Sequence, residues 1–372
     1  MIVQYPAGLD IMHVVEKFAN AKNMNNRGSS HISYIVAIFI CMPFLLSCGT
    51  TSGDVMKIYV DCNNVSTYRL DPQKCTIIKT GIYEKVREVS FDSDRVYIQT
   101  PYSVVAYNDL TTDSLFTCSR RGRREDEVVS LDYFWICDGT LQLYDFNSSK
   151  VLRFDASNGA FLGSVSDLEK TKRFSTLIYN ERFNNYIGLR TFTEASVPDL
   201  SIYDSDYHYV RDLDSPIKKS GITFITPFRS SYDRRILYHR AFEATIYRID
   251  ELSLTPEYYV DFGNAQIPAS YIEGHNEFDI LNYWGNNKNN LAAFIGNIDE
   301  SKDYLFFSYR FSEYVYLVKY DKKDSQSKVI RFETFDNSSI EKMTYHNGFV
   351  YVLEQSENEG GLIYKIPVSE FV

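Results

Sequence analysis

The sequence has no excess of positive charge. Its 372 residues include 39 lysines and arginines against 49 aspartates and glutamates, a formal net charge of −10. Because nucleic-acid binding needs a broadly basic surface, this balance argues against nucleic acid as a partner. The sequence also lacks the catalytic motifs G-x-S-x-G, H-E-x-x-H and G-x-G-x-x-G and the Walker loop. No catalytic residue and no cofactor is therefore predicted.

No apolar run is long enough to cross a bilayer as a helix, which takes about 20 residues. The longest, ISYIVAIFICMPFLL, covers residues 32–46, and its 15 residues suit the core of an export signal. It ends in LLSCG, which resembles the bacterial lipobox, where cleavage precedes a cysteine that becomes diacylated. If the lipobox pattern applies to this chain, Cys48 would be the lipidated first residue of the mature protein. A short membrane anchor with an unmodified cysteine is the alternative.

The N-terminal organisation follows from this signal. A signal peptide over residues 24–47 would begin at Met24 and carry Arg27 as its positive charge. Residues 1–23 then form an upstream extension that does not belong to the signal. Residues 48–54, rich in Gly and small polar residues, would be a flexible tether to the membrane. The expected location is the cell envelope, with the membrane as a partner through the lipid.

Cysteine is scarce, with six in the chain. Apart from Cys41 in the signal and Cys48, four remain: Cys62, Cys75, Cys118 and Cys137. Export permits disulfides, and Cys62–Cys75 and Cys118–Cys137 are the local pairings, while buried free thiols are the alternative. Their spacings do not suit zinc, and the histidines are scattered singly, so no metal site is predicted.

Helical periodicity is nearly absent after residue 55. Short alternating runs occur instead, such as RVYIQT (95–100) and FVYVLEQ (349–355). The 30 Tyr and 25 Phe residues also favour strands. Residues 55–372 are therefore predicted to form an all-β domain.

A longer repeat organises these strands. An apolar run ending in an aromatic residue recurs at six anchors: Tyr107, Phe154, Tyr203, Tyr247, Tyr320 and Tyr364. They are 44 to 49 residues apart, except for one spacing of 73. A period of about 40 to 50 residues is typical of β-propellers, with one four-stranded blade per repeat. Six blades are predicted, at 86–118, 128–165, 174–213, 221–262, 291–333 and 340–372.

Two parts of the chain fall outside the regular repeat. The long spacing contains an insertion over residues 263–290, which is polar, turn-rich and carries Trp284. The last blade ends too soon for a fourth strand. The segment MKIYVDC (56–62) is expected to supply that strand, so that an N-terminal strand closes the ring and removes an open edge.

At this point the sequence resembles a known family. The lipobox, the six repeats and the stretch LYDFNSSKVLRFDASNGAFLGSV (143–165) resemble six-bladed β-propeller lipoproteins of Bacteroides-type bacteria, of the NHL/TolB-like kind. Many of these proteins have no assigned activity, so the resemblance implies fold and location only. The family often has a glycine-rich stretch before this blade. Here Gly122 and Glu127 match it, while Arg124, Glu125 and Asp126 replace its centre.

Positive charge gathers on one predicted face. In a propeller, the links between blades and the loops between second and third strands share a face. The link SRRGRREDE (119–127) lies there, and the ends of three second strands carry arginine. Because arginine binds carboxylate or phosphate through paired hydrogen bonds, an anionic ligand is the hypothesis. The candidate binding residues are Arg121, Arg123, Arg190, Arg240, Arg310, Asp145 and Glu354. Loops that carry charge only because they are exposed are the alternative.

The sequence thus favours a lipid-anchored, extracytoplasmic binding or interaction propeller. Its expected partners are an envelope protein, a glycan or a peptide. The alternative is a carbohydrate- or peptide-active enzyme, a lyase or hydrolase, with its site at the central channel. An acid–base constellation at the channel mouth would distinguish the enzyme from the binding protein.

Overall fold

The computed structural model describes residues 55–371 except 72, 167–173, 175, 190–199, 214–227, 241, 252, 335–338 and 357–359. The predicted signal peptide, Cys48 and Arg190 lie outside the described residues. Within them, no helix is long and apolar enough to cross a membrane.

The first three blades are antiparallel sheets of four strands each, in chain order from the ring centre outward. Blade one contains β4 (Glu88–Asp92), β5 (Arg95–Gln99), β6 (Val104–Asn108) and β7 (Ser114–Cys118). Blade two contains β8 (Tyr133–Cys137), β9 (Thr140–Asp145), β10 (Lys150–Asp155) and β11 (Phe161–Val165). Blade three contains β12 (Thr176–Asn180), β13 (Asn185–Leu189), β14 (Leu200–Tyr203) and β15 (Tyr209–Asp212).

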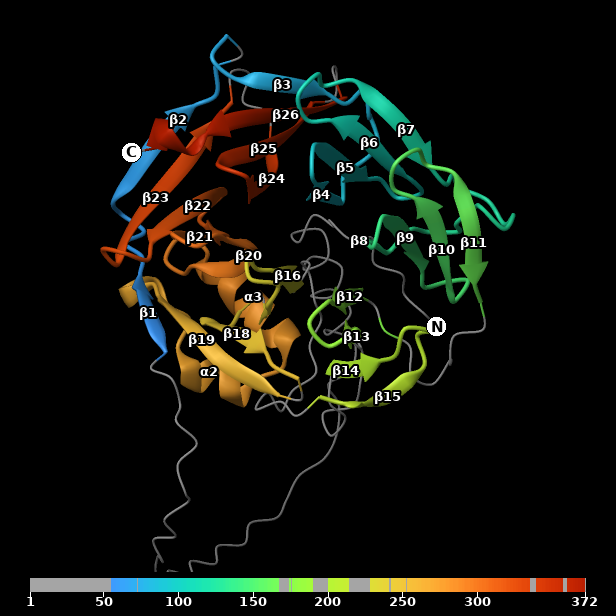
Figure 1. The fold of residues 1–372 in the computed structure, drawn as a ribbon. Coiled ribbons are helices and arrows are strands. Elements are labelled where there is room, and N and C mark those ends of the chain that lie inside the picture. The colour runs from blue at the N-terminus through green and yellow to red at the C-terminus, as the bar shows by residue number, and fades with distance from the viewer. Residues whose placement is uncertain are drawn as a thin grey trace, which may run out of the picture.

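The other three blades each gain a strand from the N-terminal segment, which follows the outer rim of the ring (Figure 1). Blade four contains β16 (Phe228–Ser230), β17 (Ile236–His239), β18 (Thr245–Ile249) and β19 (Leu254–Asp261), with β1 (Met56–Tyr59) outside them. Blade five contains β20 (Ala293–Glu300), β21 (Tyr304–Phe311), β22 (Tyr314–Asp321) and β23 (Gln326–Glu333), with β2 (Val65–Arg69) outside. Blade six contains β24 (Ser339–His346), β25 (Phe349–Ser356), β26 (Gly360–Pro367) and β3 (Thr76–Lys79), and η3 (Val368–Phe371) follows.

The six-bladed β-propeller predicted from the repeat is confirmed. All six aromatic anchors lie on the third strand of their blade, namely β6, β10, β14, β18, β22 and β26. In blades one to four the pairing between third and outer strands shifts register immediately before the anchor, as between Ala106 and Tyr107. The repeated aromatic thus marks a recurrent bulge, which bends the strand and increases its twist.

An N-terminal strand closes the ring, as predicted, but the segment chosen for it was wrong. β3 pairs antiparallel with β26, with Ile78 opposite Ile363. The predicted segment, residues 56–62, contains β1, which pairs parallel with β19 of blade four. Ile58 of β1 is fully buried between blades four and five, where it packs in the apolar cluster of that interface.

The hydrophobic core is divided among the six interfaces between neighbouring blades. One apolar cluster fills each interface, and the cluster between blades six and one joins Ile78 and Ile363 to Val89 and Ile98. Tyrosine hydroxyls add specific links, because Tyr97 donates to the carbonyl oxygen of Ala156 in blade two at 3.0 Å. Each blade therefore depends on its neighbours for burial.

The insertion is ordered and partly helical. After η2 (Gly263–Ala265) it forms α2 (Ala269–Gly274) and α3 (Glu277–Asn287). The side chain of Asn276 caps α3 by accepting a hydrogen bond from the Asp279 amide. Trp284 is buried, packs on Phe294, and donates through Nε1 to the Leu291 carbonyl at 3.0 Å. The insertion is thus a small subdomain with its own core on the link between blades four and five.

The four described cysteines are free thiols, so neither local disulfide pairing is formed. The reason is spatial: Cys62, Cys75, Cys118 and Cys137 each pack in the apolar cluster of a different blade interface. The alternative reading of the sequence, buried or half-buried free thiols, describes the structure.

Candidate functional site

The link between blades one and two holds an arginine-rich turn, residues 120–124, which we call the arginine loop. Glu127 closes this loop from inside. Its carboxylate accepts hydrogen bonds from the backbone amides of Arg123 and Arg124, both at 2.9 Å, and from Arg120 Nε at 2.9 Å. These contacts, the Arg124 amide above all, lower the pKa of Glu127. The carboxylate is therefore ionised and engaged within the loop.

Gly122 allows the carboxylate to approach this closely. A Cβ atom at this position would lie 1.9 Å from Glu127 Oε2. Lys150 on β10 ties the loop to blade two by donating to the carbonyl oxygens of Arg124 and Glu125, at 3.0 and 3.2 Å. The two positions that match the family's glycine-rich stretch, Gly122 and Glu127, are thus the ones that shape the turn.

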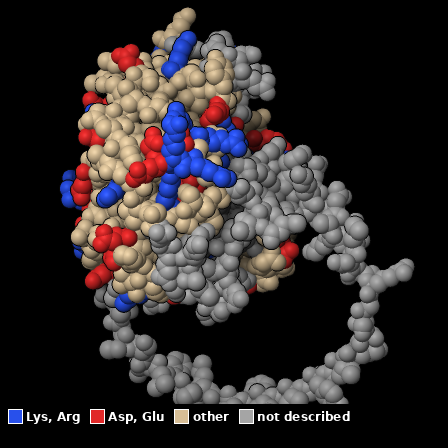
Figure 2. Space-filling model, turned by 90° about the vertical axis from the view of Figure 1, so that its right-hand side faces the viewer, with Lys and Arg blue, Asp and Glu red and all other residues tan. Residues whose placement is uncertain are grey.

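The arginine side chains of this loop point outward. The side chains of Arg120 and Arg124 are 66% and 76% exposed, and Arg121 and Arg123 are also exposed. Arg121 lies over the ring of Tyr102, in the β5–β6 loop of blade one, at 5.2 Å from its centroid. Figure 2 shows the side of the ring that carries β7 and β11, where Lys and Arg gather beside Asp and Glu. The backbone of the loop is fixed, while its guanidinium groups face solvent.

The other predicted binding residues have different surroundings. Asp145 is fully buried and accepts from the Val129 amide at 2.7 Å, so it supports the end of the same link. Glu354 is also buried, at 3% exposure, and neither carboxylate is presented at the surface. Arg240 faces Glu243 at 3.5 Å with a side chain 10% exposed. Arg310 is exposed on β21 of blade five.

A second charged group lies at the ring centre, and the sequence did not reveal it. Glu88 on β4 bonds Arg229 on β16 at 3.0 Å and Lys342 on β24 at 2.7 Å. These inner strands face one another around the axis, and blades one and four stand opposite (Figure 1). The pair of Glu88 and Arg229 therefore crosses the channel. We call Glu88, Tyr133, Arg229, Asp299 and Lys342 the axial cluster.

Burial governs the electrostatics of the axial cluster. It lowers the pKa of Lys342 and raises that of Asp299, whose Oδ2 accepts from Thr344 Oγ1 and the Tyr345 amide, each at 2.8 Å. Burial also opposes the charge of Arg229, but Glu88 and Asp299 outweigh it and raise the pKa of Arg229. Burial raises the pKa of the Tyr133 hydroxyl, which lies beside Arg229 and Glu88. Groups with perturbed pKa values gathered from four blades are a mark of functional sites as well as of structural ion pairs.

Arg87 and Asp132 lie next to the axial cluster in the sequence. Each directly precedes a member of the cluster, Glu88 and Tyr133. Arg87 Nη1 donates to the Leu131 carbonyl at 2.7 Å, and Asp132 Oδ2 accepts from the Phe146 amide at 2.8 Å. Burial, aided by Asp145, raises the pKa of Asp132 to about 7. The arginine loop and the axial cluster thus lie near the same ends of β4 and β8.

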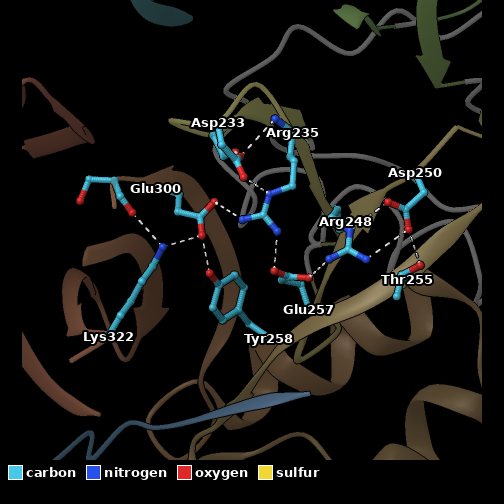
Figure 3. A network of polar contacts seen from close by, with 11 residues as sticks. Asp233, Arg235, Arg248, Asp250, Thr255, Glu257, Tyr258, Glu300 and Lys322 are labelled. Carbon is cyan, nitrogen blue, oxygen red and sulfur yellow. Dashed lines mark hydrogen bonds and ion pairs between the residues drawn. The ribbon is translucent and has the colours of Figure 1, made fainter. Parts of the chain in front are cut away.

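A third charged network joins blades four and five (Figure 3). Glu257 binds Arg235 at 2.8 Å and Arg248 at 2.7 Å, and Glu300 binds Lys322 at 2.6 Å. Burial works against ionisation of Asp233, but hydrogen bonds from Arg235 and Ser231 lower its pKa to about 2. Because its cations and carboxylates pair with one another, this network is a structural brace.

The described part of the chain offers no candidate metal site. There, no group of three or more His, Cys, Asp or Glu residues is placed to hold a metal ion.

The fold defines the class of this protein, a six-bladed β-propeller with an N-terminal strap of three strands. The chain belongs to the family described as "Domain of unknown function (DUF4934)", which matches residues 82–370. A Bacteroides fragilis protein described as exported has a similar structure, with a TM-score of 0.58 and 12% identity, over 84% of this chain and 99% of that one. Virginiamycin B lyase from Staphylococcus aureus follows with a TM-score of 0.44 and 12% identity, over 79% and 88%. No curated protein matches the sequence.

Proposed function

We propose that this protein is a lipid-anchored, extracytoplasmic binding propeller that recognises carboxylate groups through the arginine loop. One observation carries the proposal: Glu127 fixes the backbone of the loop while Arg121, Arg123 and Arg124 stay exposed. A preformed turn loses little entropy on binding, and guanidinium groups pair with carboxylates through two parallel hydrogen bonds. The cellular location rests on the apolar run 32–46 and Cys48, and it agrees with the exported description of the Bacteroides fragilis protein.

The axial cluster favours binding over the alternative, an enzyme at the central channel. General acid–base chemistry needs one group free to give a proton and another free to take one. In the axial cluster, Glu88 instead pairs with both Arg229 and Lys342. Both oxygens of Glu88 are therefore engaged by cations, which suits a structural or binding role.

The test of the arginine loop is a charge-matched comparison. The variant R121A/R123A/R124A is compared with K74A/K302A/K323A, which removes the same charge at three exposed lysines elsewhere. The probes are poly-glutamate and polygalacturonate, so that a peptide source and a glycan source of carboxylate are distinguished. We expect the loop variant to lose about tenfold or more in affinity for at least one probe, in a salt-dependent way. Equal binding by both variants would refute recognition by the loop.

The lipid anchor is tested separately. Cells expressing the full chain are labelled with an alkyne fatty acid and fractionated, beside cells expressing Cys48→Ser. We expect label and membrane association in the parent and neither in the variant. Label that survives the substitution would show that Cys48 is not the acylated residue.

A further inference from the structure

Two lysines face each other on neighbouring strands of blade five. Lys319 on β22 and Lys328 on β23 are direct partners in the antiparallel register, and both are half-buried. Two residues further along the same face, Leu317 and Ile330 pack in the apolar cluster shared with blade six, so the lysines also face blade six. Directly opposite residues have Cβ atoms about 4.5 to 5.5 Å apart, and like charges there destabilise a sheet. The blade therefore carries a repulsive pair at the edge of this interface.

The two lysines also lack a carboxylate within the described part of the chain. Lys319 makes no hydrogen bond or ion pair there, and its Nζ lies 4.6 Å from the centroid of the Tyr304 ring. Lys328 Nζ donates to the carbonyl oxygen of Phe371 at 3.1 Å and forms no ion pair. Three other lysines of low exposure each bond a carboxylate at 2.5 to 2.7 Å, namely Lys322, Lys342 and Lys365. The charges of Lys319 and Lys328 are thus left without a counter-ion.

A cavity lies beside the pair, and we call it the lysine pocket. It has a volume of about 210 Å³, and its lining includes both lysines, Asp321, Gln326 and Phe371. At about 30 Å³ for each water molecule, it has room for about seven waters or for a small ligand. Gln326 is exposed, so the pocket opens to solvent. Asp321 accepts from the Lys323 amide at 2.9 Å and pairs with neither lysine of the pocket.

The donors of the lysine pocket indicate an anionic ligand. An ammonium group has three N–H donors, so both lysines retain donors that no described residue takes up. The side-chain amide of Gln326 bonds no described residue and adds a neutral donor. Lysine binds phosphate as a point charge, whereas the planar fork of arginine matches a carboxylate. Burial lowers the pKa of Lys319 against the opposing effect of Asp321, and Lys328 lowers it further. A phosphate between the lysines would relieve this repulsion.

We propose that the lysine pocket binds a phosphate group, carried by a small phosphate or by a phospholipid headgroup. The phosphate lies between Lys319 and Lys328 and accepts hydrogen bonds from both ammonium groups and from the Gln326 amide. The repulsive pair thereby becomes two ion pairs that share one anion. The pocket lies by the turn between β22 and β23, and such turns lie on the opposite face of the ring from the links between blades. It is therefore separate from the arginine loop in place and in ligand chemistry.

The first test is the titration of inorganic phosphate by calorimetry. The variant K319Q/K328Q is compared with K74Q/K302Q, which removes the same charge at two exposed lysines elsewhere. We expect saturable binding by the parent and by K74Q/K302Q, and affinity lower by about tenfold or more in K319Q/K328Q. Because K319Q/K328Q removes a like-charge pair, its thermal midpoint without phosphate should be unchanged or higher. Loss of binding would then not reflect loss of folding.

A second test distinguishes the two sources of phosphate. Both variants, in a Cys48→Ser background so that no acyl chain contributes, are sedimented with vesicles of phosphatidylglycerol. If the ligand is a headgroup, K319Q/K328Q should bind these vesicles less than K74Q/K302Q; if it is a small phosphate, only calorimetry should separate the variants. The variant R121A/R123A/R124A should keep its phosphate affinity within about twofold, so the result does not depend on the arginine loop. Equal behaviour of K319Q/K328Q and K74Q/K302Q in both tests would overturn the proposal.

Discussion

Ile78 provides the most direct test of how the ring is held closed. It is fully buried on β3, opposite Ile363, and packs in the cluster shared by blades six and one. The substitution Ile78→Ala removes apolar volume from this interface and leaves a cavity. Such truncations cost about 2 to 5 kcal/mol, and complete burial places this one near about 3 to 4 kcal/mol. For a domain of about 300 residues, this corresponds to a midpoint lower by about 5 °C.

The matched control is Ile58→Ala on β1, where the side chain is equally buried but the blade already has four strands of its own. Both variants should lower the thermal midpoint by similar amounts, while hydrogen exchange distinguishes them. We expect Ile78→Ala to accelerate amide exchange in β26 and β4, and Ile58→Ala to do so in β19. If Ile78→Ala leaves exchange in β26 unchanged, or shifts the midpoint by less than about 1 °C, closure by β3 is refuted.

Two further predictions concern Asp132 and the thiols. Because the folded protein raises the pKa of Asp132 to about 7, ionisation of Asp132 costs stability above that pH, and the cost disappears as pH falls toward its ordinary value. Asp132→Asn should therefore be more stable than the parent at about pH 8 and equal to it near pH 4 in urea unfolding, and a constant difference would contradict this assignment. For the thiols, alkylation of the unfolded, unreduced propeller should modify all four of Cys62, Cys75, Cys118 and Cys137, as intact mass would show, and modification of two would reveal a disulfide.

The repeat in the sequence predicted the architecture because every blade has the same local feature, an apolar third strand that carries an aromatic anchor. The aromatic anchors occupy the third strands, where apolar alternation and the following turn are visible in a short window. The closing strand was misplaced because two short N-terminal segments both read as strands. Pairing with β26 rather than β19 depends on the whole ring, and nothing in residues 56–62 or 76–79 alone decides it. The helix α3 was missed because its apolar face is reduced to Ile280, Leu281 and Trp284 within a polar stretch.

The candidate sites divide in the same way. The arginine loop is contiguous, so its composition indicated a charged feature, whereas the role of Glu127 depends on the folded turn and is not visible in the sequence. The axial cluster draws one residue from each of five blades, and only closure of the ring brings Glu88, Arg229 and Lys342 together. The sequence signal for this cluster was a charged residue on the first strand of a blade, as with Glu88, Arg229 and Lys342. It does not separate a channel-facing side chain from an exposed one.

The N-terminal strap has a mechanical consequence. Any pull transmitted through the chain before residue 55 reaches β1 first, then β2, and β3 last, because they follow one another in sequence along blades four, five and six. β1 and β2 lie outside blades that are already complete, so either can detach without opening the ring. Detachment of β1 and β2 would therefore absorb the pull before it reaches β3, the strand that closes the ring.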